Sequence, residues 1–282
     1  MDTVLDSQFP GFKVLAKIGQ GAASTIYAVQ NPKSKQVWAL KHVIRNSDKD
    51  MRFLEQVEQE YAVASKLDHP NIRKVEKLIR NRKMFRLADI VLVMELVDAE
   101  TVDLHPPEQI RGALDIFVQV ARALAHMHER GFIHADLKPT NIMVDDRGTV
   151  KLIDLGQACQ IGAVKKRIQG TPGYMAPEQA HRDAITERTD VYNFGATMYW
   201  ILCREVIPTA MPPSDDRTSL YSGAIDAENL ELPTPPREKN PAVPEALSDL
   251  ILACVQPQPA DRPQSMAEVL RSLEAIREAT AP

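Results

Sequence analysis

Three side chains that suit phosphoryl transfer lie within one short run, residues 134–141, which reads His-Ala-Asp-Leu-Lys-Pro-Thr-Asn. Asp136, Lys138 and Asn141 are close enough in the sequence to converge in one loop. The aspartate can orient a hydroxyl and accept its proton, the lysine can offset charge on a transferring phosphoryl group, and the asparagine oxygen can bind Mg²⁺. We therefore take this run as the candidate centre of the chemistry.

A second group of polar side chains could complete such a site. Asp154 follows a predicted strand at residues 151–153 and precedes a glycine, Gly156, which suits a second metal ligand. Lys41 lies in the middle of an apolar strand and Glu60 on the next helix, so the pair could be held against an anionic ligand. The alternative interpretation is two ordinary polar turns that flank a hairpin.

A glycine-rich turn, Gly19 to Ser24, lies between two predicted strands. Its two glycines, Gly19 and Gly21, let the backbone approach phosphates closely and offer amide N–H donors. An ordinary hairpin turn is the alternative. A dinucleotide-binding turn is disfavoured because a strand follows, not a helix.

The first third of the chain is predicted to be rich in strands, which must position Lys41 and the glycine turn. Apolar patterns predict strands at residues 12–18, 25–29, 37–43 and 90–94. Phe53, Val57, Tyr61 and Ala64 recur at helical spacing and predict a helix over 51–67, which residues 68–71 stop.

Helices dominate the remainder, which must position the run at 134–141. Periodicity predicts helices at 110–130 (ended by Gly131), 186–203, 244–255 and 265–278, and the Pro-, Ser- and Asp-rich residues 205–245 predict a long irregular connection. A strand-rich first third and a helical remainder indicate an α+β protein of two lobes.

Composition narrows the classes of protein further. The 282 residues are 44% hydrophobic and 26% charged, with a net charge of −4, so we expect a globular protein that binds no nucleic acid and no anionic membrane surface. Three scattered cysteines and the lack of a signal peptide favour a reducing, cytoplasmic location. The longest apolar stretch, at 196–203, is too short to span a membrane.

Taken together, these motifs resemble the eukaryotic-type (Hanks-type) serine/threonine protein kinases, including the bacterial members, from about Phe12 to Glu274. The resemblance implies the bilobal kinase fold, with a small β-rich N-lobe carrying one main helix and a larger helical C-lobe. The implied parts are an N-terminal extension at 1–11, the N-lobe and hinge at 12–97, the C-lobe at 98–278 and a tail at 279–282. It also implies ATP, Mg²⁺ and a protein substrate with serine or threonine, and leaves room for a regulatory partner or domain.

The resemblance assigns expected roles to particular residues. Asp136, Lys138, Lys41 and Glu60 are expected to be catalytic, and Asn141 and Asp154 to bind the metal ion. The residues expected to bind the nucleotide, among them the gatekeeper Met94 and the apolar positions that sandwich adenine, are Ile18, Gly19, Gly21, Ile26, Ala39, Lys41, Met94, Glu95, Val97 and Met143.

Other motifs carry the resemblance into the second half of the chain. Residues 170–178 are similar to the segment that closes the activation loop, and within it Thr171 is expected to hydrogen-bond Asp136 and Lys138, a serine/threonine feature. Asp190 is expected to anchor the catalytic loop, and Arg262 to form a salt bridge with Glu178.

The chain departs from the family pattern in four places. Ala135 replaces the arginine that normally pairs with a phosphate on the activation loop, and residues 157–169 contain no Ser, Thr or Tyr to phosphorylate. The two absences agree, and they predict a kinase that needs no activation-loop phosphorylation; an unused Ala135, with regulation by phosphates elsewhere, is the alternative. Ser24 replaces the last loop glycine, and the stretch from 98 to 107 is short, which predicts a trimmed helix there.

Two rival functions remain on the sequence alone. The changes at Ala135 and Ser24 keep open a catalytically weak or inactive pseudokinase that acts as an interaction module. A small-molecule phosphotransferase of related fold is the other rival, but residues 170–178 and Arg262 argue against it because they would shape a shelf for a peptide.

Overall fold

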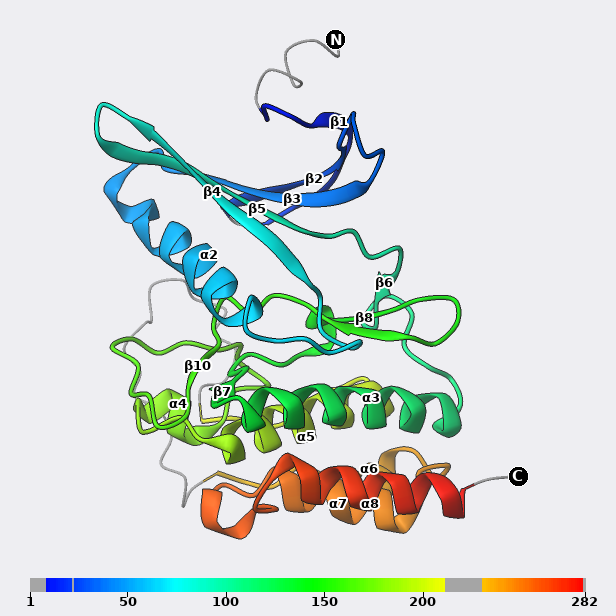
Figure 1. Cartoon of the computed structure of the whole chain (residues 1–282). Coiled ribbons are helices and arrows are strands. Elements are labelled where there is room, and N and C mark those ends of the chain that lie inside the picture. The colour runs from blue at the N-terminus through cyan, green and yellow to red at the C-terminus, as the bar shows by residue number, and fades with distance from the viewer. Residues whose placement is uncertain (1–8, 22, 211–229, 281–282) are drawn as a thin grey trace. The chain divides into compact units, whose positions relative to one another are not determined.

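The computed structural model describes residues 9–21, 23–210 and 230–280, and the statements below concern these residues (Figure 1). Contacts divide the chain into two compact units. The first comprises the described residues up to Asp68 together with Arg73–Asp98, and the second comprises His69–Ile72 with the described residues from Ala99 onward. Each unit is described by itself.

The first unit is built on one antiparallel sheet of five strands, in the order β1-β2-β3-β5-β4. Consecutive strands are neighbours except where β5 enters between β3 and β4, and a two-residue turn joins β4 to β5. The strand bounds are β1 (Lys13–Gln20), β2 (Ser24–Gln30), β3 (Val37–Ile44), β4 (Val75–Lys83) and β5 (Arg86–Glu95). The four strands predicted from the sequence are therefore confirmed.

The edge strand β4 was not predicted from the sequence. Two charged residues in succession, Glu76 and Lys77, follow Val75 and break the alternation that marks a strand. The structure explains the break, because the register with β5 shifts between Val75 and Lys77, so one residue is skipped in the pairing.

The helix α2 (Met51–Ala64) covers one face of this sheet, as Figure 1 shows. Its buried residues pack with alternate residues of the central strands in a cluster of Ala39, Val43, Leu54, Val57, Ile90, Leu92 and Met94. A second cluster, which includes Phe9, Phe12 and Leu40, packs on other residues of the same strands. The helix was predicted to extend to residue 67, but it ends at Ala64. Beyond that residue the chain forms a tighter turn, in which the N–H of Leu67 donates to the carbonyl of Ala64 three residues earlier.

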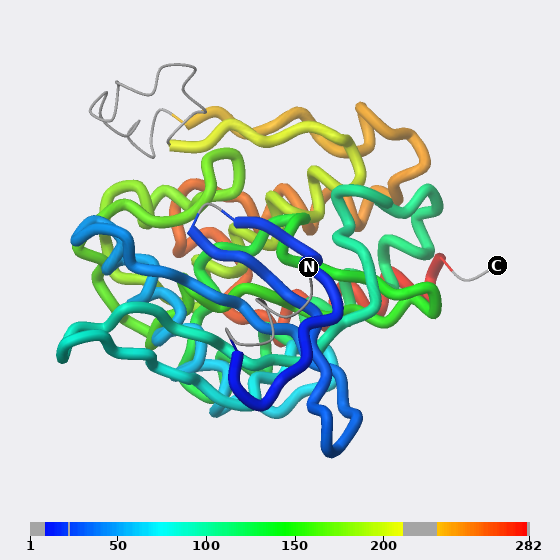
Figure 2. The backbone as a smooth tube through the Cα atoms, turned by 90° about the horizontal axis from the view of Figure 1, so that it is seen from above, coloured from blue at the N-terminus to red at the C-terminus, as the bar shows by residue number. Residues whose placement is uncertain are grey.

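Four long helices form the second unit, close to the predicted ranges. They are α3 (Ile110–Glu129), α5 (Glu187–Cys203), α7 (Glu245–Cys254) and α8 (Met266–Ala279). The helix α3 contacts both α5 and α8 (Figure 1, Figure 2). Gly195 of α5 allows a close approach to α7, because a Cβ there would lie 2.6 Å from Cβ of Cys254.

Short elements connect these helices. Three strands pair as β6 (Glu100–Thr101), β8 (Ile142–Val144) and β9 (Val150–Leu152), and two more pair as β7 (Phe132–Ile133) and β10 (Cys159–Gln160). The short helices of the second unit, among the described residues, are η2 (Pro139–Asn141), α4 (Pro177–His181), α6 (Pro236–Lys239) and η4 (Pro259–Asp261). In the first unit, η1 (Asp48–Asp50) directly precedes α2.

Two predicted irregular regions can be compared with the structure. Residues 98–107 contain β6 and turns and no helix, so the trimmed connection predicted there is confirmed. The predicted connection at 205–245 is irregular at 205–210 and 230–235 but forms α6 and the start of α7 further on, and residues 211–229 lie outside the described residues. No helix within the described ranges is long and apolar enough to cross a membrane.

A buried ion pair ties α4 to the C-terminal end of the second unit. The guanidinium of Arg262, only 1% exposed, donates to both carboxylate oxygens of Glu178, at 2.8 and 3.0 Å. It also donates to the backbone carbonyls of Arg188, Gln256 and Pro257. The ion pair predicted from the sequence is therefore confirmed, and all the charge of Arg262 is compensated inside the protein.

We expect the substitution Arg262→Met to lower the free energy of unfolding by about 3–5 kcal/mol, because it leaves the buried carboxylate of Glu178 without its cation. Urea unfolding followed by circular dichroism measures the change. The matched control is Arg237→Met, which removes an exposed ion pair with Glu245 and should cost less than about 1 kcal/mol. Equal effects of the two substitutions would contradict the assigned importance of the buried pair.

Candidate active site

Lys41 and Glu60 form an ion pair within the first unit, as the sequence predicts. Alternation along β3 puts Lys41 on the same face as Ala39 and Val43, which pack against α2. Glu60 follows the buried Val57 by three residues on α2 and so shares its face. The Lys41 Nζ lies 2.7 Å from Glu60 Oε2.

The structure adds a third member to this pair. The guanidinium of Arg73 donates to the other oxygen of Glu60, Oε1, at 3.2 Å. Glu60 is buried, so two cations compensate one carboxylate that has lost most of its water. Sequence reasoning missed Arg73, because nothing in the sequence relates it to a helix residue 13 positions earlier.

Several residues expected to contact the nucleotide lie near Lys41 on neighbouring strands of the first unit. Ile26 of β2 lies opposite Lys41, and Ala39 of β3 lies opposite Met94 of β5. Gly19 lies opposite Ile26 in the register of β1 with β2. The sheet therefore groups these five positions on four strands.

A small residue at position 21 suits the turn between β1 and β2. The N–H of Gly21 donates to the carbonyl of Ser24 at 2.7 Å, and a Cβ at Gly21 would lie 2.7 Å from Ser24 Oγ, which would have to move. Ile18 precedes the turn on β1 and is half exposed.

The last expected nucleotide contacts lie at the end of β5 and in the second unit. Glu95 ends β5 and Val97 follows it, and both side chains are half-buried. Met143 lies in β8, opposite Lys151 of β9.

Asp136, Lys138 and Thr171 form one hydrogen-bonded group in the second unit. The hydroxyl of Thr171 donates to Asp136 Oδ1 at 2.8 Å and accepts from Lys138 Nζ at 2.8 Å. Lys138 Nζ also lies 3.3 Å from Asp136 Oδ2. The contact predicted for Thr171 is therefore confirmed, and it holds a carboxylate and an ammonium group within reach of the same hydroxyl.

Asn141 lies in η2, which follows the same loop. Its side-chain Nδ2 donates to the carbonyl of Asp136 at 2.9 Å, which orients the amide and leaves the side-chain oxygen as an acceptor. The backbone carbonyl of Asn141 accepts from the N–H of Ile153, so the chain just before Asp154 is tied to the loop. Asp154 itself has a left-handed backbone, with φ of 61°.

These two oxygen donors suit a magnesium ion. An amide oxygen and a carboxylate are hard ligands, and Mg²⁺ is commonly held by one or two carboxylates and the phosphates of its nucleotide. Within the described residues, no group of three or more His, Cys, Asp or Glu side chains is placed to hold a metal ion. Asn141 and Asp154 are the residues that could hold such an ion, with the phosphates of a bound nucleotide and water as further ligands.

Asp190 of α5 holds the backbone of the catalytic loop, as predicted. Its carboxylate is fully buried and accepts the N–H groups of His134 and Ala135, both at 2.9 Å. His128 Nε2 lies 2.8 Å from the same carboxylate. Burial alone would raise the pKa of Asp190, but the hydrogen bond and charge of His128, with the other contacts, lower the pKa below its ordinary value of 3.8.

The residue that replaces the usual arginine, Ala135, takes a left-handed backbone, with φ of 59°. An L-residue rarely adopts this conformation, and the two hydrogen bonds to Asp190 and the packing around it maintain it. The side chain of Ala135 is buried with Ile133, Cys159 and Ile185.

Gln179 of α4 is a positioning residue that sequence reasoning missed. Its Nε2 donates to the carbonyl of Ala135 at 2.7 Å and to that of Gln169 at 3.2 Å. Its Oε1 accepts from Asn193 Nδ2 at 2.9 Å. A single neutral amide therefore links the catalytic loop, the segment before Gly170 and the helix α5.

His128 is the second positioning residue missed. It lies near the end of α3, where a histidine gives no local sign of a distant partner. The ring of His128 binds Asp190, 62 residues further along the chain. Cys159, in contrast, is an ordinary buried thiol, and burial raises its pKa, which keeps it protonated and unreactive.

The lowered pKa of Asp190 predicts a pH dependence of stability. Because the folded pKa is lower than the unfolded pKa, the stability that Asp190 contributes is complete above the unfolded pKa and is lost as the pH falls through the folded pKa. We expect Asp190→Asn to lower the free energy of unfolding by about 2–4 kcal/mol at pH 7. The difference from the parent chain should shrink as the pH falls below the ordinary value of 3.8.

Denaturant titrations at a series of pH values measure this difference. Asp249→Asn, an exposed residue of α7, is the matched control and should change stability by less than about 0.5 kcal/mol at every pH. A constant difference between Asp190→Asn and the parent chain across the acid range would contradict the assignment.

Comparisons with known proteins agree with this geometry. A family model described as "Protein kinase domain" matches residues 12–273. The chain is 28% identical over 264 residues to serine/threonine-protein kinase PrkC of Bacillus subtilis, which covers 89% of this chain and 38% of that protein. It is 30% identical over 272 residues to the DNA damage-responsive serine/threonine-protein kinase RqkA of Deinococcus radiodurans. That match covers 91% of this chain and 38% of RqkA.

A third relative is serine/threonine-protein kinase PknB of Mycolicibacterium smegmatis, 28% identical over 280 residues, with 94% of this chain and 43% of that protein covered. The chain thus spans between 38% and 43% of the length of these curated relatives. Because the family model matches most of its residues, the chain belongs to the protein kinase domain family.

Proposed function

We propose that this chain is a serine/threonine protein kinase that transfers the γ-phosphate of ATP to hydroxyl groups of proteins. The observation that carries the proposal is the hydrogen-bonded group of Asp136, Lys138 and Thr171. In it, the hydroxyl of Thr171 already donates a hydrogen bond to the carboxylate of Asp136. A substrate hydroxyl that replaced or joined that of Thr171 would find a carboxylate to accept its proton.

Each residue has a distinct part in the proposed reaction. Asp136 orients the substrate hydroxyl and accepts its proton, and Lys138 offsets the charge of the transferred phosphoryl group. Lys41, held by Glu60, binds the α and β phosphates of ATP. Most of the rate enhancement then comes from positioning and electrostatics, since the protein forms no covalent bond with the phosphoryl group.

Asn141 and Asp154 would hold Mg²⁺, which supplies positive charge that polarises the phosphate oxygens when it is bound. The orientation of Asn141 by the carbonyl of Asp136 supports this assignment, because it frees the amide oxygen. The family pattern assigns contacts with the nucleotide base to Ile26 and Ala39 in the first unit and to Met143 in the second, and contacts with its edge to Glu95 and Val97.

We also propose that no activation-loop phosphate is needed. Residues 157–169 contain no hydroxyl side chain, and Ala135 cannot pair with a phosphate. The contacts of Gln179 with the carbonyls of Ala135 and Gln169 support the proposal, because they join the catalytic loop to the end of that segment without any charge.

The remaining expectations stay proposals. The lobe boundaries at 12–97 and 98–278, a cytoplasmic location and a regulatory partner or domain belong to the proposed kinase. A pseudokinase is the second candidate function, and the changes at Ala135 and Ser24 are the observations that favour it.

We expect Asp136→Asn to lower the rate of phosphate transfer by about 10²–10⁴-fold, since the amide cannot accept the proton, while ATP affinity changes little. Transfer of radiolabelled phosphate to a generic basic protein, followed by mass spectrometry of the product, measures both the rate and the residue that is modified. Asp154→Asn should instead weaken magnesium-dependent nucleotide binding.

The matched control is Asp146→Asn, an exposed residue in the turn between β8 and β9, which should leave transfer unchanged. No transfer by the parent chain, or equal transfer by Asp136→Asn, would favour the pseudokinase over the enzyme.

The proposal on the activation loop is tested with a phosphatase. Purified chain treated with phosphatase should keep its full rate of transfer, because there is no hydroxyl at 157–169 to carry a phosphate. A phosphoprotein added to the same tube confirms that the phosphatase is active. A large loss of rate would show that a phosphate elsewhere on the chain is required.

A further inference from the structure

A small basic pocket lies in the first unit, away from all the residues used in the proposed reaction. The connection from β3 to α2 and the turn end of the β4–β5 hairpin line this open pocket, at the same end of the sheet in both overall views (Figure 1, Figure 2). Its volume is about 250 Å³, below the roughly 300–1,000 Å³ of pockets for whole small molecules. The pocket therefore suits a single polar group carried by a larger ligand.

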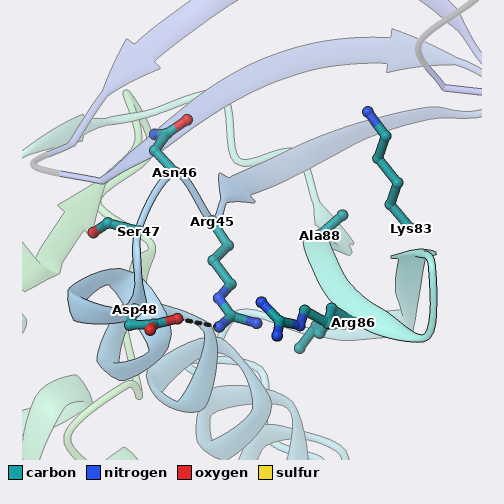
Figure 3. Close-up of a pocket in the computed structure, with 8 residues that line it drawn as sticks. Arg45, Asn46, Ser47, Asp48, Lys83, Arg86 and Ala88 are labelled. Carbon is teal, nitrogen blue, oxygen red and sulfur yellow. Dashed lines mark hydrogen bonds and ion pairs between the residues drawn. The ribbon is translucent and has the colours of Figure 1, made fainter.

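Two guanidinium groups dominate this pocket. Figure 3 shows the guanidinium of Arg86 pointing toward that of Arg45, whereas Lys83 points away from both. The Arg45 side chain is only 20% exposed, and its carboxylate partner is Asp48, which is 91% exposed. Among the residues that line the pocket Asp48 alone is acidic, so the pocket carries an excess of positive charge.

The wall that carries Arg45 is fixed before any ligand arrives. The Asp50 carboxylate accepts the N–H groups of Asn46 and Ser47, at 3.0 and 2.7 Å, and the Ser47 hydroxyl at 3.0 Å. The N–H of Arg45 donates to the carbonyl of Ala88 at 2.8 Å, which ties this connection to β5. A preorganised wall lowers the entropy cost of binding.

The opposite wall carries unusual residues for a hairpin. Lys83 and Arg86 lie directly opposite one another, and like charges in that position are destabilising. The turn between them has positive φ at both residues, 48° and 67°, as two-residue hairpin turns commonly do, but Met84 and Phe85 stand where Asn, Asp or Gly is usual. These side chains are 86% and 97% exposed. Local costs of this kind gather at functional sites.

We propose that this pocket binds the phosphate of a phosphorylated serine or threonine in a protein segment, held between the guanidinium groups of Arg45 and Arg86. A phosphomonoester carries a charge of about −1.5 to −2 at pH 7, which matches two guanidinium groups in charge and in hydrogen-bond geometry. The exposed side chains of Met84 and Phe85 would contact apolar residues of the same segment.

A phosphorylated protein fits better than an anionic membrane. The chain has a net charge of −4, which opposes approach to a negative bilayer. The source of the phosphate rests on the proposed function, because a serine/threonine kinase makes the phosphomonoesters that this pocket would recognise.

A bound phosphate would also act on the proposed active site within the first unit. Arg45 lies just before η1 and α2, and Arg86 begins β5, so a phosphate that bridges them fastens the start of α2 to the sheet. The same helix carries Glu60, which holds Lys41. Phosphate binding here thus stabilises the Lys41–Glu60 pair, a regulatory input that needs no hydroxyl in residues 157–169.

The test uses the whole chain with Asp136→Asn, so that phosphate transfer is negligible during the measurement. The probes are a fluorescent peptide, Gly-Leu-Gly-phosphothreonine-Gly-Leu-Gly, and its unphosphorylated twin, with saturating Mg-ATP present to occupy the nucleotide site. Fluorescence anisotropy should show at least tenfold tighter binding of the phosphopeptide. Arg86→Gln and Arg45→Gln should each weaken that binding at least tenfold.

Asp48→Asn provides a variant with the opposite expected effect. It removes the exposed carboxylate that competes for Arg45, so phosphopeptide affinity should rise about threefold, an effect that general damage to the fold would not produce. Arg237→Gln, at an exposed ion pair of α7, is the control and should leave the affinity unchanged.

Three results would overturn the proposal. The first is equal binding of the two peptides, and the second is phosphopeptide binding that survives Arg86→Gln. The third is preferential sedimentation of the chain with vesicles containing phosphatidylglycerol, if Arg86→Gln abolishes that sedimentation and the phosphopeptide does not compete with it. The last result would assign the pocket to lipid. Because binding is measured without turnover, a failure to bind the phosphopeptide leaves the proposed kinase activity untouched. Conversely, if the chain binds the phosphopeptide but the parent chain transfers no phosphate, only the proposed kinase activity is rejected.

Discussion

A buried carboxylate, that of Asp190, sets the geometry on which the candidate active site depends. A charge without water must find partners, and Asp190 finds them in His128 and in two backbone N–H groups of the catalytic loop. The loop in turn accepts the unfavourable left-handed conformation of Ala135. The same hydrogen bonds therefore stabilise both the buried charge of Asp190 and the unfavourable backbone conformation of Ala135.

Polar contacts continue from this carboxylate to the far end of the second unit. Gln179 joins the catalytic loop to α5, and its neighbour Glu178 joins α4 to Arg262. Thr189, which directly precedes Asp190, donates its hydroxyl to the carboxylate of Glu178. The loop that carries Asp136 and the ion pair of Arg262 are thus held by adjacent residues of α4 and α5.

Sequence reasoning succeeded where a local pattern carries the information. Periodicity identified α3 and α5, and the resemblance to the kinase family implied the partners of Thr171 and Arg262. It failed where pairing is decided by the rest of the fold. The edge strand β4 lacks a regular alternation of apolar and polar residues, because its pairing with β5 shifts by one residue after Val75. His128 and Gln179 reach partners 62 and 44 residues away, and a histidine or glutamine in a helix gives no local signal of such a contact.

The neutral link through Gln179 bears on how such a site can be controlled. An arginine–phosphate pair is a switch because its energy appears with a covalent charge and disappears with it. An amide that bonds to the carbonyls of Ala135 and Gln169 is present at all times and carries no charge to remove. The hydrogen bonds of Gln179 thus hold the catalytic loop without a charge that a phosphatase could remove. If the proposed independence from an activation-loop phosphate holds, control by charge acts on another element, and the pocket lined by Arg45 and Arg86 carries an excess of positive charge that suits it.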